Sequence, residues 1–409
     1  MKASATAEFS GRRLLVLGAG HHQVPLIRCA RRLGCTVVTA DHTRENPGHA
    51  LADESRIVST VDHHGILALA RSLQIDGVVT FGSDVSAPTV TYVAQSLGLP
   101  GNSFAAGSLL QRKDLTRELQ RKIGLPHPAF LAASSLDEFL AALRQGSVPP
   151  PILVKPVDSS GSKGQSVLAS IDDASAAYQR ARAFSRCDTV IAERLLQPDM
   201  LELVGDIYVH GGQLRFGHYG HNYFLDGRVP RVPVGEITPG FFGDDVEREL
   251  DRQLQAIVEA AGVDSGCMNF DALVSKGEVH LLDIGLRNGG NYLTEVIRLS
   301  SGVDLAEAAL YAAFGREYPI RARHESECQW VLSYLLNSAT EGTLRRHRIS
   351  PSVREWLVDE VLFVEPGARV KPYVQGDHGL GICLLVVPSR EHALALYPRL
   401  PREVQVDVA

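Results

Sequence analysis

The stretch that decides the fold reads ILVKPVDSSGSKGQSV, residues 152–167. Ile152–Val154 is a short apolar run rich in β-branched residues, which predicts a buried strand. Lys155 lies where this strand ends, because Pro156 cannot donate to a strand ladder. The serines and glycines that follow predict a loop whose backbone N–H groups can approach phosphate oxygens closely. The loop lacks the GxxxxGK[ST] spacing of a P-loop.

A second stretch, MNFDALVSKGEVHLLDIGLRNGG at residues 268–290, predicts a β-hairpin. Two apolar strands, Phe270–Val274 and Val279–Ile284, flank the polar turn SKGE. Asp271 and Asp283 lie one on each strand, where antiparallel neighbours can face each other. Such carboxylates repel unless a cation lies between them, and Mg²⁺ prefers carboxylates plus substrate oxygens. The pair therefore predicts a magnesium site.

Arg287 follows this hairpin, where its guanidinium can neutralise charge on a transferring phosphoryl group. The alternative interpretation is a solvated hairpin with two exposed aspartates. For Asp283 that alternative is weak, because apolar residues surround it and a carboxylate in such a place needs a partner. Taken together, the lysine strand, the loop and the hairpin predict a phosphoryl-transfer site.

Four motifs resemble, in order along the chain, those of the ATP-grasp superfamily, whose enzymes activate a carboxylate with ATP and pass it to an amine or related nucleophile. They are the helix and turn at Asp114–Pro128 after Lys113, the loop VKPVDSSGSKG, the hinge Ile191–Leu195, and the two aspartates followed by Arg287. The resemblance covers nearly the whole chain. It implies an α/β protein with an N-terminal parallel-sheet (Rossmann-like) domain, a two-part α+β ATP-grasp fold and a C-terminal α+β piece.

The resemblance also implies roles for the residues that bind ATP phosphates. Lys113 and Lys155 match two lysines that contact these phosphates. The matching lid loop, which closes over the phosphates, consists of Ser160, Gly161, Ser162, Lys163 and Gly164. Lys163 and Arg287 are the residues expected to act in catalysis, and a closed lid would keep water from the acylphosphate.

The remaining ATP contacts are expected at the hinge. Glu193 matches an acid that shapes the adenine pocket, and backbone groups of Arg194 and Leu195 are expected to read the base. Asp206 is expected to hold the ribose. Glu202 competes for that role, and the sequence does not separate the two.

Two residues depart from the family pattern at the metal site. The family usually has Glu where this chain has Asp283, and Asn, a further magnesium ligand, where it has Gly285. Asn288, Asn269 or water could compensate. We predict that Asp271 and Asp283 bind Mg²⁺, with Mn²⁺ as an alternative ion.

Composition limits the class of protein. A chain of 409 residues suggests about two or three domains. The net charge of −6 argues against nucleic acid as an obligatory partner, and no apolar run reaches membrane-spanning length. The opening MKASATAEFSGRR has no apolar signal core, and the six cysteines form no CxxC pair, so we expect a cytoplasmic protein with reduced thiols. Adjacent histidine pairs are a weak alternative sign of zinc. We also expect a homodimer.

We predict four parts, at residues 1–108, 109–195, 196–320 and 321–409. The first alternates apolar strands and helical stretches over residues 12–100, a rhythm that predicts a parallel sheet. The second begins with a charged linking helix, Leu109–Ile123, and forms the ATP-grasp lid. The third carries the metal hairpin and an amphipathic helix, Val246–Ala261. The fourth is expected to close the ATP half with strands at Val331–Leu336 and Gly381–Val387.

An NAD-dependent dehydrogenase is a competing interpretation of the first part. Gly18 and Gly20, followed by Asp41, mimic a dinucleotide-binding fingerprint, but its third glycine is missing. In the family that the chain resembles, the strand-end loops of this domain face the substrate. Gly18–His22 and Phe81–Asp84 are therefore substrate-side candidates.

The resemblance implies that the γ-phosphoryl group of ATP passes to a carboxylate, giving an acylphosphate and ADP, and that an amine then attacks to form an amide. We expect small amino-acid-like carboxylate and amine substrates. Candidate contacts for them are His218, Tyr219, His221, Asn222, Tyr223, Asn288, Asn291 and Tyr292. Two alternatives remain: a bicarbonate-dependent carboxylase of the same architecture, and a non-catalytic nucleotide-binding regulator, which Gly285 favours.

Overall fold

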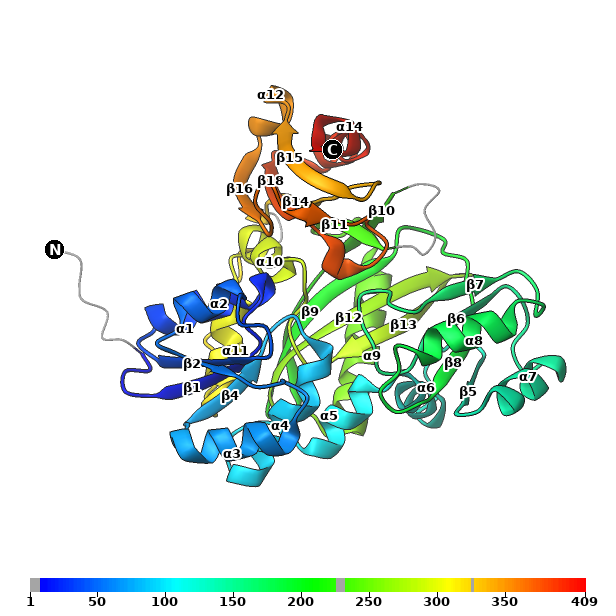
Figure 1. The fold of residues 1–409 in the computed structure, drawn as a ribbon, viewed down its shortest axis with the longest axis horizontal. Coiled ribbons are helices and arrows are strands. Elements are labelled where there is room, and N and C mark those ends of the chain that lie inside the picture. Colours follow the sequence, from blue (N-terminus) through cyan, green and yellow to red (C-terminus); the bar gives the residue numbers. More distant parts are fainter. Residues whose placement is uncertain (1–7, 226–231, 325–326) are drawn as a thin grey trace.

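The described residues form four sheets, and Figure 1 shows one of them in the blue N-terminal part and another in the orange and red C-terminal part of the chain. The computed structural model describes residues 8–225, 232–324 and 327–409. Residues 1–7, part of the opening segment in which no signal core is expected, lie outside these ranges. Within them, no helix combines the length and the apolar character needed to cross a bilayer.

The first sheet is parallel, as the alternating pattern predicts, with strand order β3-β2-β1-β4. Its strands are β1 (Arg13–Leu17), β2 (Thr36–Asp41), β3 (Glu54–Ile57) and β4 (Gly77–Thr80). The helices of this part are η1 (His21–Gln23), α1 (Val24–Arg32), α2 (Pro47–Leu51), α3 (His63–Leu73), η2 (Asp84–Ser86), α4 (Ala87–Leu97) and, returning from later in the chain, α11 (Leu305–Ala313).

Strand β1 shows why this sheet is apolar on both sides. Leu14 and Val16 pack into a core with α1 and α11, whereas Leu15 and Leu17 pack into another with α3 and α4. Side chains alternate between the faces of a strand, so a strand covered by helices on both faces is apolar at every position. Figure 1 shows α1 and α11 on one side of the strands and α3 and α4 on the other.

Asp41, at the end of β2, forms hydrogen bonds within the N-terminal part of the chain. Its carboxylate accepts hydrogen bonds from the backbone N–H of Ala19 at 2.9 Å and of Thr43 at 2.9 Å, and from the amide of Asn46 at 2.9 Å. It therefore fastens the glycine turn after β1. The dinucleotide interpretation needs this carboxylate for a ribose, so the structure gives that interpretation no support.

The largest sheet is antiparallel and has the order β13-β12-β9-β10-β11-β14-β18-β16. Its strands are β9 (Leu203–His210), β10 (Gln213–Phe224), β11 (Pro233–Thr238), β12 (Gly266–Ser275), β13 (Glu278–Gly285), β14 (Trp330–Leu336), β16 (Leu357–Leu362) and β18 (Gly381–Val387). It runs continuously across the boundary predicted at residue 320. The division into four parts stays a prediction.

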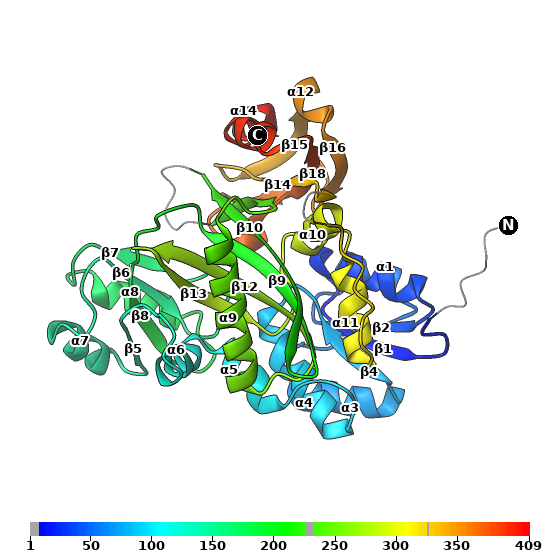
Figure 2. The ribbon, with the colours of Figure 1, turned by 180° about the vertical axis from the view of Figure 1, so that it is seen from behind.

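Helix α9 (Asp244–Ala261) covers one face of this sheet, and Figure 2 shows it in front of β9 and β12. Leu250, Leu254 and Ile257 are fully buried against strands β9, β12 and β13, as the amphipathic pattern predicts. Acidic residues in its first turn suit the positive end of the helix dipole, and Gly262, with φ of 67°, ends it in the left-handed conformation.

The lid is a four-stranded antiparallel sheet of order β5-β8-β6-β7. Its elements are β5 (Phe130–Ala133), α7 (Leu136–Arg144), β6 (Ile152–Pro156), β7 (Ser166–Leu168), α8 (Ala174–Arg182) and β8 (Val190–Arg194). The predicted lysine strand is therefore β6, with Lys155 near its end. Both helices pack on one core with the buried side chains of β6 and β8.

The prediction of one linking helix over Leu109–Ile123 is wrong. Two helices, α5 (Phe104–Gln111) and α6 (Lys113–Lys122), meet at Arg112, whose backbone is extended. The N–H of Lys113 donates to the carbonyl of Val157 at 2.9 Å. In a continuous helix this N–H would instead donate to a carbonyl of the preceding turn. Lys113 thus becomes the first residue of α6.

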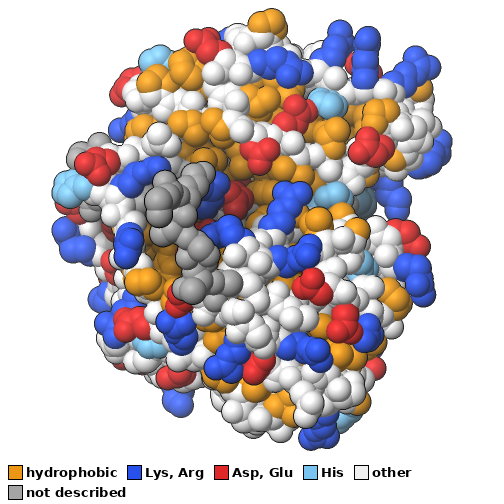
Figure 3. All heavy atoms as spheres, turned by 90° about the vertical axis from the view of Figure 1, so that its left-hand side faces the viewer, with side chains coloured by type: hydrophobic (Ala, Val, Ile, Leu, Met, Phe, Trp, Pro, Cys, Tyr) orange, Lys and Arg blue, Asp and Glu red, His pale blue; other side chains and the backbone are white. Residues whose placement is uncertain are grey.

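The C-terminal part adds a small sheet of order β17-β15-β19 beside the large one. The remaining elements are α10 (Leu293–Ser301), β15 (Gly342–Ile349), α12 (Pro351–Arg354), β17 (Arg369–Val370), η4 (Gly376–His378), α13 (Arg390–Leu396), η5 (Tyr397–Arg399), α14 (Leu400–Glu403) and β19 (Val404–Val408). On the face shown in Figure 3, basic and acidic side chains are interspersed.

Burial of α9 should be a main support of the large sheet. Replacing Leu254, which is 0% exposed, by alanine leaves a cavity, and we expect the free energy of unfolding to fall by about 2–5 kcal/mol. Leu115→Ala is the matched control, because Leu115 is 40% exposed, and its effect should stay within about 0.5 kcal/mol. Urea titration measures both; equal losses would contradict this packing.

Candidate active site

A pocket of about 870 Å³ lies between the lid and the large antiparallel sheet. One wall is formed by alternate residues of neighbouring strands, which share a face because side chains alternate along a strand. These wall residues are Glu202, Val204, Asn222, Phe224, Glu236, Asn269, Asp271 and Leu273. The opposite wall comes from the lid loop and β6, and the N-terminal domain contributes His22, Gly82 and Asp84. Both predicted substrate-side loops thus reach the pocket.

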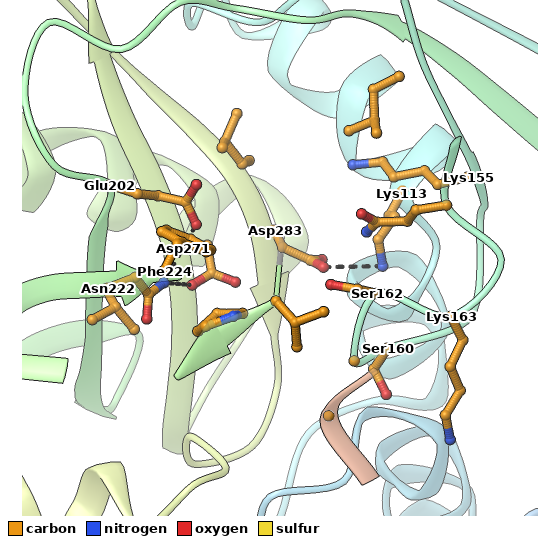
Figure 4. A pocket seen from close by; sticks show the side chains of 18 of the residues that line it. Lys113, Lys155, Ser160, Ser162, Lys163, Glu202, Asn222, Phe224, Asp271 and Asp283 are labelled. Carbon is orange, nitrogen blue, oxygen red and sulfur yellow. Dashed lines mark hydrogen bonds and ion pairs between the residues drawn. The ribbon is translucent and has the colours of Figure 1, made fainter. Parts of the chain in front are cut away.

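The two predicted phosphate lysines lie together and each meets a carboxylate. Lys113 Nζ lies 3.0 Å from Asp283 Oδ2, and Lys155 Nζ lies 2.7 Å from Glu193 Oε2. Figure 4 shows the Lys113–Asp283 pair at the centre of the site. Because α6 begins at Lys113 and β6 ends near Lys155, backbone geometry directs both ammonium groups to one place.

The electrostatics of the two lysines differ. Burial alone would lower the pKa of Lys113, but the charges of Asp283 and Asp84 outweigh it and hold that pKa above its usual value. Burial lowers the pKa of Lys155, and Glu193 only partly offsets this because Arg117 repels the same ammonium. Lys155 is therefore the lysine that gains more from an incoming phosphate.

Asp271 and Asp283 are directly paired in the register of β12 and β13, as the hairpin predicts. Asp271 accepts a hydrogen bond from the Asn222 amide at 3.0 Å. Burial and the charge of Asp283 raise the pKa of Asp271 to about 6, whereas Lys113 outweighs burial and holds the pKa of Asp283 below its usual value. Two facing carboxylates, one of which makes ionisation of the other more costly, fit a divalent cation with oxygen ligands.

Arg287 lines the pocket but is already paired. Its Nε and Nη2 lie 2.7 Å from the two carboxylate oxygens of Asp84, and its Nη1 lies 2.8 Å from Asn269 Oδ1. Gly285 makes room for this pair, because a Cβ there would lie 2.5 Å from Asp84 Oδ1. Gly285 supplies no side-chain oxygen for a metal, but its lack of a side chain leaves space for the carboxylate of Asp84 from the N-terminal part.

The prediction that Asp206 holds the ribose is contradicted. Asp206 is fully buried and does not line the pocket; its carboxylate accepts hydrogen bonds from the N–H of Gly289 and the amide of Asn269. It fixes the backbone after Arg287 instead. Glu202, the competing candidate, does line the pocket and accepts a hydrogen bond from Asn222 at 3.3 Å. Asn288 also bonds Asp206 and is buried outside the pocket, so it is not placed as a compensating metal ligand.

The lid loop follows the prediction except at its end. Ser160, Gly161, Ser162 and Lys163 line the pocket. Gly164 does not; a Cβ on it would lie 2.9 Å from the Phe184 ring, so this glycine serves close packing onto α8.

The lid loop is also fastened to the C-terminal part. Lys163 Nζ lies 2.9 Å from Asp377 Oδ2, and the N–H of Gly376 donates to the carbonyl of Gly161 at 3.1 Å. In Figure 4, Lys163 is directed away from Lys113 and Lys155. The assignment of Lys163 as a catalytic residue therefore stays a prediction. For Lys163 to reach the phosphates, the lid loop would have to change its conformation.

At the hinge, Glu193, Arg194 and Leu195 line the pocket. The N–H of Arg194 donates to Ala129 O at 2.8 Å and that of Leu195 to Pro151 O at 2.8 Å. These two N–H groups are therefore not available to hydrogen-bond an adenine base. If backbone groups of the hinge bind the base, they must be groups other than these two.

Most of the predicted acceptor residues on β10 point elsewhere. The Tyr219 hydroxyl bonds Asp251 on α9, and His218 bonds Ser300 at 3.1 Å. His221 packs against the rings of Phe241 and Phe242. Of that group, Asn222 lines the pocket, as does Asn291 beyond Arg287. Tyr292 donates its hydroxyl to His21 O at 3.2 Å.

Sequence reasoning missed Arg117, a fully buried residue of α6. Its Nε lies 2.7 Å from Glu193 Oε1, and its other nitrogens donate to the carbonyls of Leu281 and Leu282 on β13. An arginine in a charged helix, two residues from Leu115 and from Leu119, carries no local sign of burial. Asp377, which holds the lid loop, was also missed, because its contact with Lys163 joins residues more than 200 positions apart in the sequence.

Comparison with known proteins adds to this geometry. No family model matches the chain. The formate-dependent phosphoribosylglycinamide formyltransferase of Burkholderia thailandensis is 30% identical over 200 residues, 46% of this chain and 48% of that protein. The enzyme of the same name from Geobacter metallireducens is 24% identical over 290 residues, 70% of each chain. The aligned region thus spans about half the length of the first of these relatives.

Solved structures match over nearly the whole chain. The L-amino acid ligase from Bacillus licheniformis has a TM-score of 0.84 at 20% identity and covers 97% of this chain and 99% of its own. Phosphoribosylglycinamide synthetase from Anaerococcus prevotii has a TM-score of 0.77 at 18% identity, covering 97% and 100%. The biotin carboxylase domain of Hydrogenobacter thermophilus 2-oxoglutarate carboxylase, solved with MgADP and bicarbonate, has a TM-score of 0.75 at 14% identity, covering 97% and 91%. The resemblance that the motifs predict is confirmed, and the chain has the fold of the ATP-grasp superfamily.

Proposed function

We propose that this protein is an ATP-dependent carboxylate–amine ligase that joins two small amino-acid-like substrates through an acylphosphate, releasing ADP and phosphate. The observation that carries this is the pocket in which Lys113, Lys155, Asp271 and Asp283 converge. Two lysines and a carboxylate pair suited to Mg²⁺ are what phosphoryl transfer requires.

The names of similar proteins support the substrate class. The curated relatives are named for formate, a carboxylate, and for phosphoribosylglycinamide, the molecule that receives the formyl group. One similar structure is an L-amino acid ligase. We propose that this chain likewise takes a small carboxylate and a small amine. Homodimerisation and a cytoplasmic location stay predictions.

The residues suggest how the reaction proceeds. Asp271 and Asp283 would hold Mg²⁺, which neutralises phosphate oxygens and orients the γ-phosphoryl group. Lys113 now neutralises Asp283 at 3.0 Å and can turn to the phosphates when the cation takes over that carboxylate. Lys155 supplies the second ammonium from β6. Ser160–Gly164 would close over the acylphosphate and exclude water.

A non-catalytic nucleotide-binding regulator is the second candidate. The observation that favours it is the Asp84–Arg287 pair beside Gly285, because a paired guanidinium is less able to stabilise a transferring phosphoryl group. Such a protein would bind Mg-ATP without turnover.

The function is tested by ADP release from Mg-ATP across the twenty standard amino acids and formate, singly and in pairs, with bicarbonate present or absent. We expect release that requires one carboxylate and one amine, because the acylphosphate needs both partners to turn over. Release with bicarbonate alone would establish a carboxylase instead. ATP binding with no release above background for any pair would contradict the ligase and favour the regulator.

Asp283 is the most informative single site. Asp283→Asn removes one charge from the metal pair and the partner of Lys113, and we expect kcat to fall by about 100-fold or more. Asp264→Asn is the control, because Asp264 is exposed and lies outside the pocket. Steady-state ADP release measures both. Near-normal turnover in Asp283→Asn would show that the metal pair is misassigned.

The lid fastening gives a separate prediction. Asp377→Asn removes the ion pair with Lys163, in which both side chains are partly exposed, so stability should change by less than about 1 kcal/mol. The lid loop should nevertheless open more often, and trypsin should cleave after Lys163 faster than in the wild type. Saturating Mg-ATP should protect both proteins. Identical cleavage rates without nucleotide would mean that the pair does not restrain the loop.

A further inference from the structure

Glu236 is a buried carboxylate that lines the pocket and has no role in the site described so far. It lies on β11, is 3% exposed, and is paired in register with Asn222 on β10. Directly opposed residues of antiparallel strands share a face and lie about 5 Å apart. Asn222 in turn bonds Asp271 at 3.0 Å. Glu236 therefore lies one strand beyond Asn222 and three strands from Asp271, on the side away from the lid lysines.

The position of this strand relative to the lysines follows from the sheet order. From the edge nearest the lid, the strands run β13, β12, β9, β10 and β11. Figure 4 shows the corresponding side chains in sequence from Lys155 and Lys113 through Asp283 and Asp271 to Asn222. Glu236 is the next acid in this direction. A nucleophile that approaches the acylphosphate opposite the lysines would pass it.

In the part of the chain that the structure describes, the carboxylate of Glu236 is held by a hydroxyl and not by a cation. It bonds the hydroxyl of Ser333 on β14, and among the described residues no ammonium or guanidinium lies within ion-pair distance of it. A buried acid without a counter-ion is costly unless its site receives one.

The charges around Glu236 favour a group that accepts a proton. Burial is the main cause that raises the pKa of Glu236 to about 8; the hydrogen bond from Ser333 opposes this rise, and the charges of Asp271 on β12 and Asp206 on β9 add to it. The hydroxyl of Tyr397, in η5, is a further titratable group near this carboxylate. A pKa near neutrality is what a general base requires, and an ammonium placed beside the carboxylate would ionise it.

We propose that Glu236 binds the ammonium group of the amine substrate and acts as the general base that deprotonates it. This inference rests on the proposed ligase function and narrows it to an acceptor with a protonated amine. One ammonium proton passes to the Glu236 carboxylate. The amine nitrogen then bonds the acylphosphate carbonyl carbon, the carbon–oxygen bond to phosphate breaks, and the second proton leaves with phosphate. Glu236 returns its proton to water.

The test separates acyl activation from amine attack. Wild type and Glu236→Gln receive Mg-ATP with formate or each standard amino acid as the carboxylate, and either hydroxylamine or an amino acid as the nucleophile. Hydroxylamine is largely unprotonated at neutral pH and needs no base. In Glu236→Gln we expect the rate of amide formation relative to hydroxamate formation to fall by about a hundredfold. Glu236→Asp keeps the carboxylate and should restore part of the amide rate.

Each other outcome overturns a specific step. A parallel loss of hydroxamate and amide would mean that Glu236 acts on ATP, Mg²⁺ or the fold, and amide formation at the wild-type rate would mean that no base is needed there. Ser333→Ala is the matched control: it removes the hydrogen bond but keeps the acid, and its ratio of the two rates should stay near that of the wild type. Absence of carboxylate-dependent hydroxamate in the wild type would refute the ligase function itself, and this inference with it.

Discussion

The buried contact between Arg117 and Glu193 is the interaction on which the rest of the site depends. Arg117 belongs to α6, Glu193 to the last strand of the lid, and the guanidinium also holds two carbonyls of β13. Three elements from different parts of the chain therefore meet at one side chain that is 0% exposed. Removing charges from water is expensive, and here each of the three nitrogens of Arg117 donates to an acceptor.

This contact also sets the charge of the phosphate end. Burial alone would raise the pKa of Glu193, but Arg117 and Lys155 outweigh it and hold that pKa low. The Glu193 carboxylate thus lies between two cations, Arg117 and Lys155. The lysine side of the pocket therefore carries a net positive charge. A polyphosphate supplies the missing negative charge. The fold places this excess where α6 begins and β6 ends, so it is fixed by backbone geometry rather than by flexible side chains.

The sequence predicts the parts of this arrangement that depend on local pattern. The β-branched run before Lys155, the period of α9 and the spacing of Asp271 and Asp283 across a hairpin are all visible in short windows, and the structure has them where they are expected. The parts that fail depend on contacts distant in the sequence. The helix is interrupted at Arg112, where the N–H of Lys113 donates to the carbonyl of Val157. Asp206 lies outside the pocket, where its carboxylate accepts a hydrogen bond from the N–H of Gly289.

Gly285 departs from the family pattern, and its structural surroundings explain what the departure allows. From the sequence alone, this glycine is a position at which a metal-binding side chain is missing. In the structure the same missing side chain lets Asp84, from the N-terminal domain, bind Arg287 at 2.7 Å beside the metal pair. Asp84 thus links a substrate-side loop to the residue expected to meet the transferring phosphoryl group.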